Sequence, residues 1–444
     1  MSVALDDTAV GALATLVAGF DPGQLTDAAK AAVRRAILDL LGAAAAGAGT
    51  AAARAAREVA AGLHAAGPAS VWFGGARLVP AGAAFANASA ASALDLDDGH
   101  RAAGGHPGAS VIPAALAVGQ AVNASADELM AAIVLGYEVA VRVAAARDVA
   151  KLDTLSTGRW CGYGAAAVAA YLSRFDAATT AEALAIAGVV APGLSAAGYS
   201  RRMGNSVKEG IPWAAAQGLA AAELAARGYT GPIDILDHPD YFDAATVRRG
   251  FDGWAVERIY FKPYACCRWI HAALDAVFAA REDAGGAVQE IDGIEVETFE
   301  RALRLGNEVA PTTLEGAQYS VPFCVALGAL AGPAALLPMR AGDLHRADVR
   351  ALAARVRMRV APDLDRRFPN QVPARVLVRA GNRIVEREVA IPLGDPDNPM
   401  SDAQLLEKFT ALAPGAAGRI AGPILGLGTS HDAAELFDAL ESFL

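Results

Sequence analysis

Helix-start signals, each followed by an alanine-rich apolar run, recur through the first 262 residues. Alanine has the highest helix propensity, and Ser, Thr or Asp just before an apolar run is a common helix N-cap. Thr26 precedes one such run, and residues 125–128 (Ser-Ala-Asp-Glu) and 179–182 (Thr-Thr-Ala-Glu) have the spacing of capping boxes. The run 213–226 is followed by Gly228, which suits a left-handed C-cap. This part of the chain therefore predicts a series of closely packed helices.

Alternating apolar and charged residues replace this pattern after residue 285. Such alternation predicts half-buried strands, and it occurs at residues 291–299, 355–360, 375–379 and 384–391. The Gly-Asn pair between the last two stretches predicts a tight hairpin turn. Helices are predicted between and after these strands, at residues 314–330, 347–354, 402–412 and 433–443.

These patterns predict a mainly α fold in two domains. A chain of 444 residues is longer than a single hydrophobic core usually grows. Residues 395–399 (Asp-Pro-Asp-Asn-Pro) mark a boundary, and the helices beyond them suggest that the chain returns to its first domain. We expect a large all-helical domain from residues 1–264 and 397–444, and a small α+β lid domain from residues 265–396.

Composition narrows the classes of partner. Apolar residues make up 54% of the chain and charged residues 19%, which predicts a large buried interior. The net charge is −10 and no basic tract occurs, so we expect no nucleic acid partner. Four cysteines in a chain of this length fit reduced thiols in the cytoplasm. We expect no signal peptide, because the N-terminus has no basic region followed by an apolar core and a cleavage site. We expect no membrane-spanning segment, because charges or glycines interrupt every long apolar run.

Three carboxylates and two imidazoles lie within twelve residues, at Asp95, Asp97, Asp98, His100 and His106. Residues that share a helix face are three or four apart, so this run is typical of a helix end that opens into a loop. The aspartates could act as a base or orient one, and His106 could move protons near neutral pH. A capped, solvated loop is the alternative. A carboxylate–histidine metal site is a third interpretation, although the spacing matches no standard signature.

One basic segment precedes the apolar helix predicted from residue 213. Lys208 lies there, with Arg201 and Arg202 shortly before it. Cations at a helix N-terminus could hold a substrate carboxylate. A basic surface loop is the alternative interpretation.

A second basic segment is aromatic and apolar. Lys262 lies in it, with Arg268 and His271 following. We expect burial to lower the pKa of Lys262 and make it a usable acid. A domain hinge with a packed His271 is the alternative. Tyr319 opens a later predicted helix and is a weak candidate by itself, because such tyrosines are more often core residues.

Taken together and in this order, these segments resemble the MmgE/PrpD family, which includes 2-methylcitrate dehydratase, cis-aconitate decarboxylase and iminodisuccinate epimerase. The resemblance covers nearly the whole chain. The matching motifs are Asp95-Leu96-Asp97-Asp98 with His106-Pro107-Gly108, Gly136-Tyr137-Glu138-Val139, Thr157-Gly158 with Gly164-Ala165-Ala166, Lys208-Glu209-Gly210, Gly228-Tyr229-Thr230-Gly231-Pro232, Lys262-Pro263-Tyr264 with His271, Ala317-Gln318-Tyr319-Ser320, and Lys408-Phe409.

The resemblance implies a helical domain with an α+β lid, a homodimer, no metal or other cofactor, and a small carboxylate substrate held between the domains. It implies that the catalytic positions are Asp95, His106, Lys208 and Lys262. The candidate substrate-binding residues are Asp98, His100, Arg201, Arg202, Arg268, His271 and Tyr319.

The chain departs from the family pattern at three positions. Gly99 follows the paired aspartates where many members carry Thr, Leu155 replaces a common histidine, and Phe323 replaces a common tyrosine. The hydrophobic side chains of Leu155 and Phe323 suggest a less charged or bulkier substrate than methylcitrate. The leading hypothesis is a dehydratase of a small di- or tricarboxylate. A decarboxylase, an epimerase or isomerase, and a non-catalytic ligand-binding dimer are the alternatives.

Overall fold

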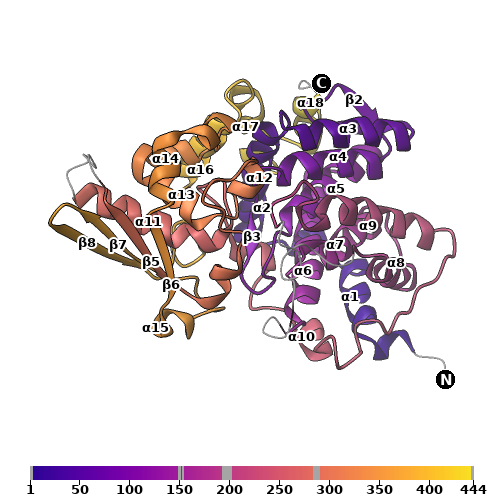
Figure 1. The fold of residues 1–444 in the computed structure, drawn as a ribbon. Helices are drawn as coiled ribbons and strands as arrows, with labels where there is room; N and C mark the ends of the chain where they lie inside the picture. Colours follow the sequence, from indigo (N-terminus) through magenta and orange to yellow (C-terminus); the bar gives the residue numbers. More distant parts are fainter. Residues whose placement is uncertain (1–3, 149–151, 153–154, 193–202, 284–290, 442–444) are drawn as a thin grey trace.

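The computed structural model describes residues 4–148, 152, 155–192, 203–283 and 291–441. Most of these residues are helical, and two parts lie side by side in Figure 1. The helical part contains α1 (Ala9–Ala18), α2 (Asp27–Gly47), α3 (Ala51–Leu63), α4 (Pro80–Ser92), α5 (Gly108–Val122), α6 (Ala126–Ala145), α7 (Cys161–Leu172), α8 (Ala177–Val189), α9 (Ile211–Ala225), α10 (Ala244–Arg249), α16 (Asp402–Leu412), α17 (Ala417–Leu425) and α18 (Ala433–Glu441).

The α+β part contains a sheet in the strand order β6-β5-β7-β8. Strands β5 and β6 are parallel, whereas β7 is antiparallel to both β5 and β8. Helix α11 packs on β7 and β8, and α13 packs on α11 and α14. The elements are α11 (Arg268–Asp283), β5 (Gly293–Thr298), α12 (Leu314–Ala317), α13 (Val321–Ala331), α14 (Ala347–Ala353), β6 (Val356–Val360), α15 (Pro362–Asp365), β7 (Ala374–Ala380) and β8 (Arg383–Val389).

Both ends of the chain contribute to the helical part. One core joins buried side chains from α1 through α9 with those of α16, α17 and α18. A second core fills the α+β part and also contacts α2 and α16. Helices α16 and α17 pack directly on α2. The domain limits at residues 264 and 396 stay predictions.

The structure corrects several details of the predicted elements. Helix α8 begins after Asp176, whose carboxylate accepts the Thr179 N–H, and not at the predicted box at residues 179–182. The predicted helix 314–330 divides at Ser320, whose hydroxyl accepts the Phe323 N–H and starts a new helix. Helix α17 was not predicted, because its glycines and Pro423 hide the pattern of buried Ile420 and Ile424.

The helical part also contains two short strand pairs that the sequence did not predict. Strands β1 (Ala66–Val71) and β2 (Ala76–Leu78) form a hairpin, and β3 (Gly99–His100) pairs with β4 (Ile259–Tyr260). Strands β2, β3 and β4 have two or three residues, which is too short to produce a periodic pattern, and the six residues of β1 do not alternate between apolar and charged. The predicted Gly-Asn hairpin between β7 and β8 is confirmed, with Gly381 at φ 56°.

No single helix among the described residues has both the length and the apolar composition of a membrane span. Only α2 and α3 taken together pass that test, and a bend of 96° separates them.

A buried ion pair attaches the C-terminal helices to the rest of the chain. Lys408 on α16 donates to the carboxylate of Asp39 on α2 at 2.6 Å and to the Leu96 carbonyl at 2.9 Å. Asp39 and Lys408 are each no more than 2% exposed. Because Leu96 lies in the loop between Asp95 and Asp97, this lysine also fixes the loop that carries the candidate acid–base residues.

Replacing Lys408 should therefore destabilise the fold. Lys408→Met leaves the Asp39 carboxylate buried without its cation, and we expect the free energy of unfolding to fall by about 3–5 kcal/mol in a urea titration. The double variant Asp39→Leu/Lys408→Met should recover most of this loss, because no unpaired charge remains buried. A Lys408→Met protein as stable as wild type would contradict this account.

Candidate functional site

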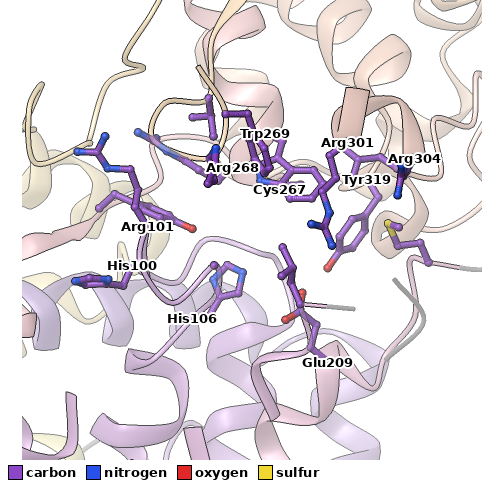
Figure 2. Close-up of a pocket in the computed structure, with 18 of the residues that line it drawn as sticks. His100, Arg101, His106, Glu209, Cys267, Arg268, Trp269, Arg301, Arg304 and Tyr319 are labelled. Atoms are coloured by element: carbon purple, nitrogen blue, oxygen red, sulfur yellow. The ribbon is translucent and has the colours of Figure 1, made fainter. Parts of the chain in front are cut away.

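A cavity of about 510 Å³ lies where the helical and α+β parts meet. Figure 2 shows His106 and Glu209 on one side, with Arg301 and Tyr319 pointing toward them from the α+β part. A pocket of this size between two parts of a chain is a usual place for a small-molecule site.

Asp95 lies at the centre of the polar cluster next to this cavity. It follows the end of α4 with φ 56°, a conformation that non-glycine residues rarely adopt. Its Oδ1 accepts a hydrogen bond from Lys262 Nζ at 3.0 Å and lies 3.7 Å from Lys208 Nζ. Asp95 is 2% exposed and Lys262 is fully buried. The two ammonium groups thus share one buried carboxylate oxygen.

The segment that carries Lys208 has unusual backbone geometry. Lys208, Glu209 and Gly210 have φ values of 46°, 60° and 80°. Consecutive left-handed residues cost free energy, and such strain is often found at functional sites. Lys208 Nζ donates to Gln318 Oε1 at 2.9 Å, and Gln318 Nε2 donates to the Ala93 carbonyl at 3.1 Å. Gln318 from the α+β part thereby connects the lysine to the loop that carries Asp95.

His106 is the cluster residue that reaches the cavity wall. Its Nδ1 lies 2.8 Å from the Asp98 carbonyl. Because a carbonyl can only accept a hydrogen bond, the neutral ring has the tautomer in which Nδ1 carries the proton and Nε2 holds the free lone pair. Nε2 lies 3.9 Å from Asp95 Oδ1, and Nδ1 lies 3.4 Å from Asp97 Oδ2. The histidine is therefore arranged to accept a proton at Nε2.

Glu209 supports this histidine from the other side. Its Oε2 accepts hydrogen bonds from the Thr157 N–H at 3.0 Å and from the Thr157 hydroxyl at 2.7 Å. The Thr157 hydroxyl oxygen in turn accepts a hydrogen bond from the backbone N–H of His106 at 3.2 Å. Thr157 thus joins the strained Lys208–Gly210 segment to the His106 loop.

Burial and charge determine the protonation of the central pair. Burial alone would raise the pKa of Asp95, but the ammonium groups of Lys262 and Lys208 outweigh it and hold this pKa well below its usual range. Burial would lower the pKa of Lys262, but the carboxylates of Asp95 and Asp97 raise it above its ordinary value. The expected lowering of the Lys262 pKa is therefore wrong, because an apolar sequence context did not reveal these carboxylates. Lys262 stays protonated and acts as a fixed positive charge.

Asp95, Asp97 and His106 could also be read as metal ligands, since one ligand atom of each lies within 4.8 Å of the others. However, Lys262 Nζ lies 3.0 Å from Asp95 Oδ1 and 3.9 Å from Asp97 Oδ1. This buried ammonium, together with Lys208, already balances the charge of the two carboxylates. The donor set therefore fits a lysine-neutralised acid–base site better than a metal centre.

Only some of the candidate substrate-binding residues line the cavity. His100, Arg268 and Tyr319 line the cavity, whereas Asp98 and His271 do not. Asp98 accepts hydrogen bonds from the Tyr137 hydroxyl at 2.5 Å and from the Gly108 N–H at 3.0 Å. Burial raises its pKa to about 7. These contacts give Asp98 a structural role beneath the loop.

His271 is fully buried, and its Nε2 lies 3.1 Å from the Cys266 carbonyl. The alternative of a packed histidine therefore describes it better than substrate binding does. His100 is also buried, and this burial lowers its pKa to about 3, so it stays neutral. Arg201 and Arg202 lie outside the described residues.

Tyr319 and Arg268 each present a polar group to the cavity. Burial raises the pKa of Tyr319, and Lys208 Nζ lies 5.5 Å from the centre of its ring. Arg268 donates to the carbonyls of Leu393 and Pro392 at 2.8 and 3.0 Å. The tyrosine is thus a neutral hydrogen-bond donor, and the arginine is a cation held rigidly by backbone groups.

Sequence reasoning missed several residues of the cavity wall. They include Arg101, Tyr260, Cys267, Trp269, Arg301 and Arg304. Arg101 directly follows His100, and Cys267 and Trp269 flank Arg268, so nearness to the chosen motifs could have suggested these three. Arg301 and Arg304 follow β5 in a stretch that carries no recognisable motif.

The three departures from the family pattern have different structural settings. Leu155 lines the cavity, but Phe323 is fully buried in the α+β core and does not line it. At Gly99, a Cβ atom would lie 2.2 Å from the Tyr260 hydroxyl oxygen. A side chain at residue 99 is therefore excluded while Tyr260 keeps its position.

The electrostatics of the central pair lead to a prediction about Lys262→Met. Without this ammonium the effect of burial is offset less, although Lys208 remains 3.7 Å from the carboxylate, and we expect the pKa of Asp95 to rise by about 1–3. A depressed carboxyl pKa stabilises the fold above the unfolded-state pKa, and that contribution is lost as the pH falls through the folded-state value. The acid-unfolding midpoint, followed by circular dichroism, should therefore move to higher pH. An unchanged midpoint would count against this account, and Lys30→Met, which removes an ion pair to exposed Asp127, is the control.

Comparison with known proteins agrees with this architecture. The MmgE/PrpD N-terminal domain matches residues 11–252, and the MmgE/PrpD C-terminal domain matches residues 264–421. A search of curated proteins gave no match. Because the two matched domains together cover nearly the whole chain, in the order that the motifs suggested, this protein belongs to the MmgE/PrpD family.

Proposed function

We propose that the protein is a cofactor-independent lyase that removes water from a small di- or tricarboxylate. The observation that carries the proposal is the position of His106, which lines the cavity beside the buried Asp95–Lys262–Lys208 cluster and is held at Nδ1 by the Asp98 carbonyl. Membership of the MmgE/PrpD family supports a lyase of this class.

The proposed chemistry begins with proton removal beside a substrate carboxylate. His106 Nε2 takes the proton, and the positive charge that forms on the ring lies 3.4 Å from the Asp97 carboxylate. The electron pair left on carbon forms the double bond as the hydroxyl group on the neighbouring carbon leaves with a proton. In this proposal Tyr319, a neutral donor at the wall, supplies that proton.

Cations around the site stabilise the negative charge that develops on the substrate. Lys208 and Lys262 are at most 6% exposed and lie behind His106, so they act through their field and by positioning Asp95. Arg268, Arg301 and Arg304 line the cavity itself and are the groups that could hold substrate carboxylates. In this arrangement the α+β part covers the acid–base cluster and supplies the carboxylate-binding wall.

Proton NMR in D2O tests the proposal directly. Purified protein is incubated with a panel of citrate-like, malate-like and imino-dicarboxylic acids, and we expect a new vinylic signal. Turnover should fall at least about 100-fold in His106→Ala and in Lys208→Ala, which lose the base and the cation that holds Asp95. Lys30→Ala, which changes an exposed ion pair far along the chain, is the control. Near-normal rates in both site variants would overturn the assignment.

The same experiment separates the alternatives. Deuterium incorporation without a vinylic product would favour an epimerase or isomerase, which exchanges a proton but expels no leaving group. Release of CO2 would favour a decarboxylase. Binding of a carboxylate without any exchange of carbon-bound hydrogen would favour a non-catalytic ligand-binding protein.

The apolar part of the cavity wall predicts which carboxylates are preferred. This part of the wall consists of Leu155, Trp269 and Phe368. The rings of Trp269 and Phe368 pack edge to face, with 5.8 Å between their centres. We expect kcat/KM to rise about fourfold for each substrate methylene that this wall buries, because each buried CH2 contributes about 0.8 kcal/mol. An alkyl-substituted dicarboxylate should thus outperform citrate. Leu155→Asn should reduce that preference, and a finding that tricarboxylates are the best substrates would contradict it.

A further inference from the structure

The pairing of β3 with β4 places Tyr260 over a position where only glycine fits. Gly99 and Tyr260 face each other in this short antiparallel pair. A Cβ atom on residue 99 would lie 2.2 Å from both Cζ and the hydroxyl oxygen of Tyr260. Real Cβ atoms essentially never approach other heavy atoms this closely. The glycine therefore creates the space that the end of the tyrosine ring occupies.

Tyr260 brings a hydroxyl group to the cavity that no described residue binds. It lines the cavity and is 6% exposed. Its hydroxyl has no hydrogen-bond partner among the residues that the structure describes. This hydroxyl is not among the sealed polar atoms that lack a partner, so it is open to the cavity and free to bind a ligand oxygen there.

The surroundings of Tyr260 keep it rigid. The guanidinium carbon of Arg268 lies 4.9 Å from the centre of the ring, within cation–π distance. Arg268 is itself held by the backbone carbonyls of Leu393 and Pro392. Burial raises the pKa of Tyr260 in spite of the nearby Lys262 and Arg268 cations. The phenol thus remains neutral and can donate a hydrogen bond throughout the neutral pH range.

We propose that Tyr260 is a substrate-binding residue that donates a hydrogen bond from its hydroxyl to a carboxylate oxygen of the substrate, and that Gly99 is present to make room for it. This inference rests on the proposed function, because it takes a small carboxylate as the ligand. It assigns to Tyr260 the role of a fixed neutral donor beside the cations Arg268 and Arg301, which supply charge at the same wall.

The test removes the hydroxyl and keeps the ring. A hydrogen bond to a charged carboxylate stabilises the bound substrate, so Tyr260→Phe should lower kcat/KM by about 10- to 150-fold, chiefly through a higher KM. The ratio of kcat/KM between wild type and Tyr260→Phe should be the same from pH 6 to 9, because the phenol does not ionise in that range. The ring and its contact with Arg268 remain, so the thermal unfolding midpoint should stay unchanged. A kcat/KM within twofold of wild type would overturn the proposal.

Tyr163→Phe is a matched control. Tyr163 on α7 is also buried, burial also raises its pKa, and it does not line the cavity. Its loss of a hydroxyl should leave kcat/KM unchanged within twofold. A loss equal to that of Tyr260→Phe would show that removing any buried phenol disturbs the protein, and this too would overturn the proposal.

Gly99→Ala tests the coupling between the two residues. The added methyl group displaces the tyrosine ring, so we expect kcat/KM to fall at least as far as in Tyr260→Phe. The double variant should lose no more than Gly99→Ala alone, because both changes remove the same hydrogen bond. Additive losses would show that the residues act separately and would contradict the inference.

A failure of the inference about Tyr260 can be distinguished from a failure of the proposed function. If the wild-type protein exchanges no carbon-bound hydrogen with any carboxylate in the panel, the proposed function fails. The same variants are then compared by calorimetric binding of succinate and citrate. Weaker binding to Tyr260→Phe than to wild type and to Tyr163→Phe would support the inference, and equal binding would overturn it.

Discussion

The buried contact between Lys262 and Asp95 is the interaction on which the rest of the site depends. Removing a carboxylate and an ammonium group from water costs several kcal/mol each, and the cost is offset only when the partners meet with good geometry. Here the strained backbone at Asp95 and Lys208 directs both side chains into one cluster. The charges of the buried lysines and aspartate therefore balance one another away from the cavity. Of this cluster, His106 is the residue that lines the cavity.

This cluster is assembled from distant parts of the chain. Gln318 binds Lys208 and the loop before Asp95, and Lys408 binds the loop just after it. Each of these bonds joins segments that are more than 100 residues apart in the sequence. The chain around Asp95 is thus held on both sides of this residue by groups whose positions depend on the complete fold.

Regular elements could be predicted from the sequence because their patterns are local. The helix 402–412 and the strand 355–360 agree with the structure to within a residue, since a cap or an alternation defines each of them. The cavity wall was harder to predict, because Arg301 and Arg304 come from a segment with no motif of its own and Tyr260 lies just before the Lys262 motif, where nothing marks it. The pKa of Lys262 was also inaccessible, since its sign depends on carboxylates more than 160 residues earlier in the chain.

The hydrogen bond between Lys208 and Gln318 has a consequence for the evolution of the protein. The family's N-terminal domain carries Asp95, His106 and Lys208, but the amide that holds Lys208 in place belongs to the C-terminal domain. Neither domain contains a finished site, so the two cannot be exchanged between relatives as independent modules. A change at Lys208 or at Gln318 must instead be matched by a change of its partner in the other domain if this hydrogen bond is to be kept.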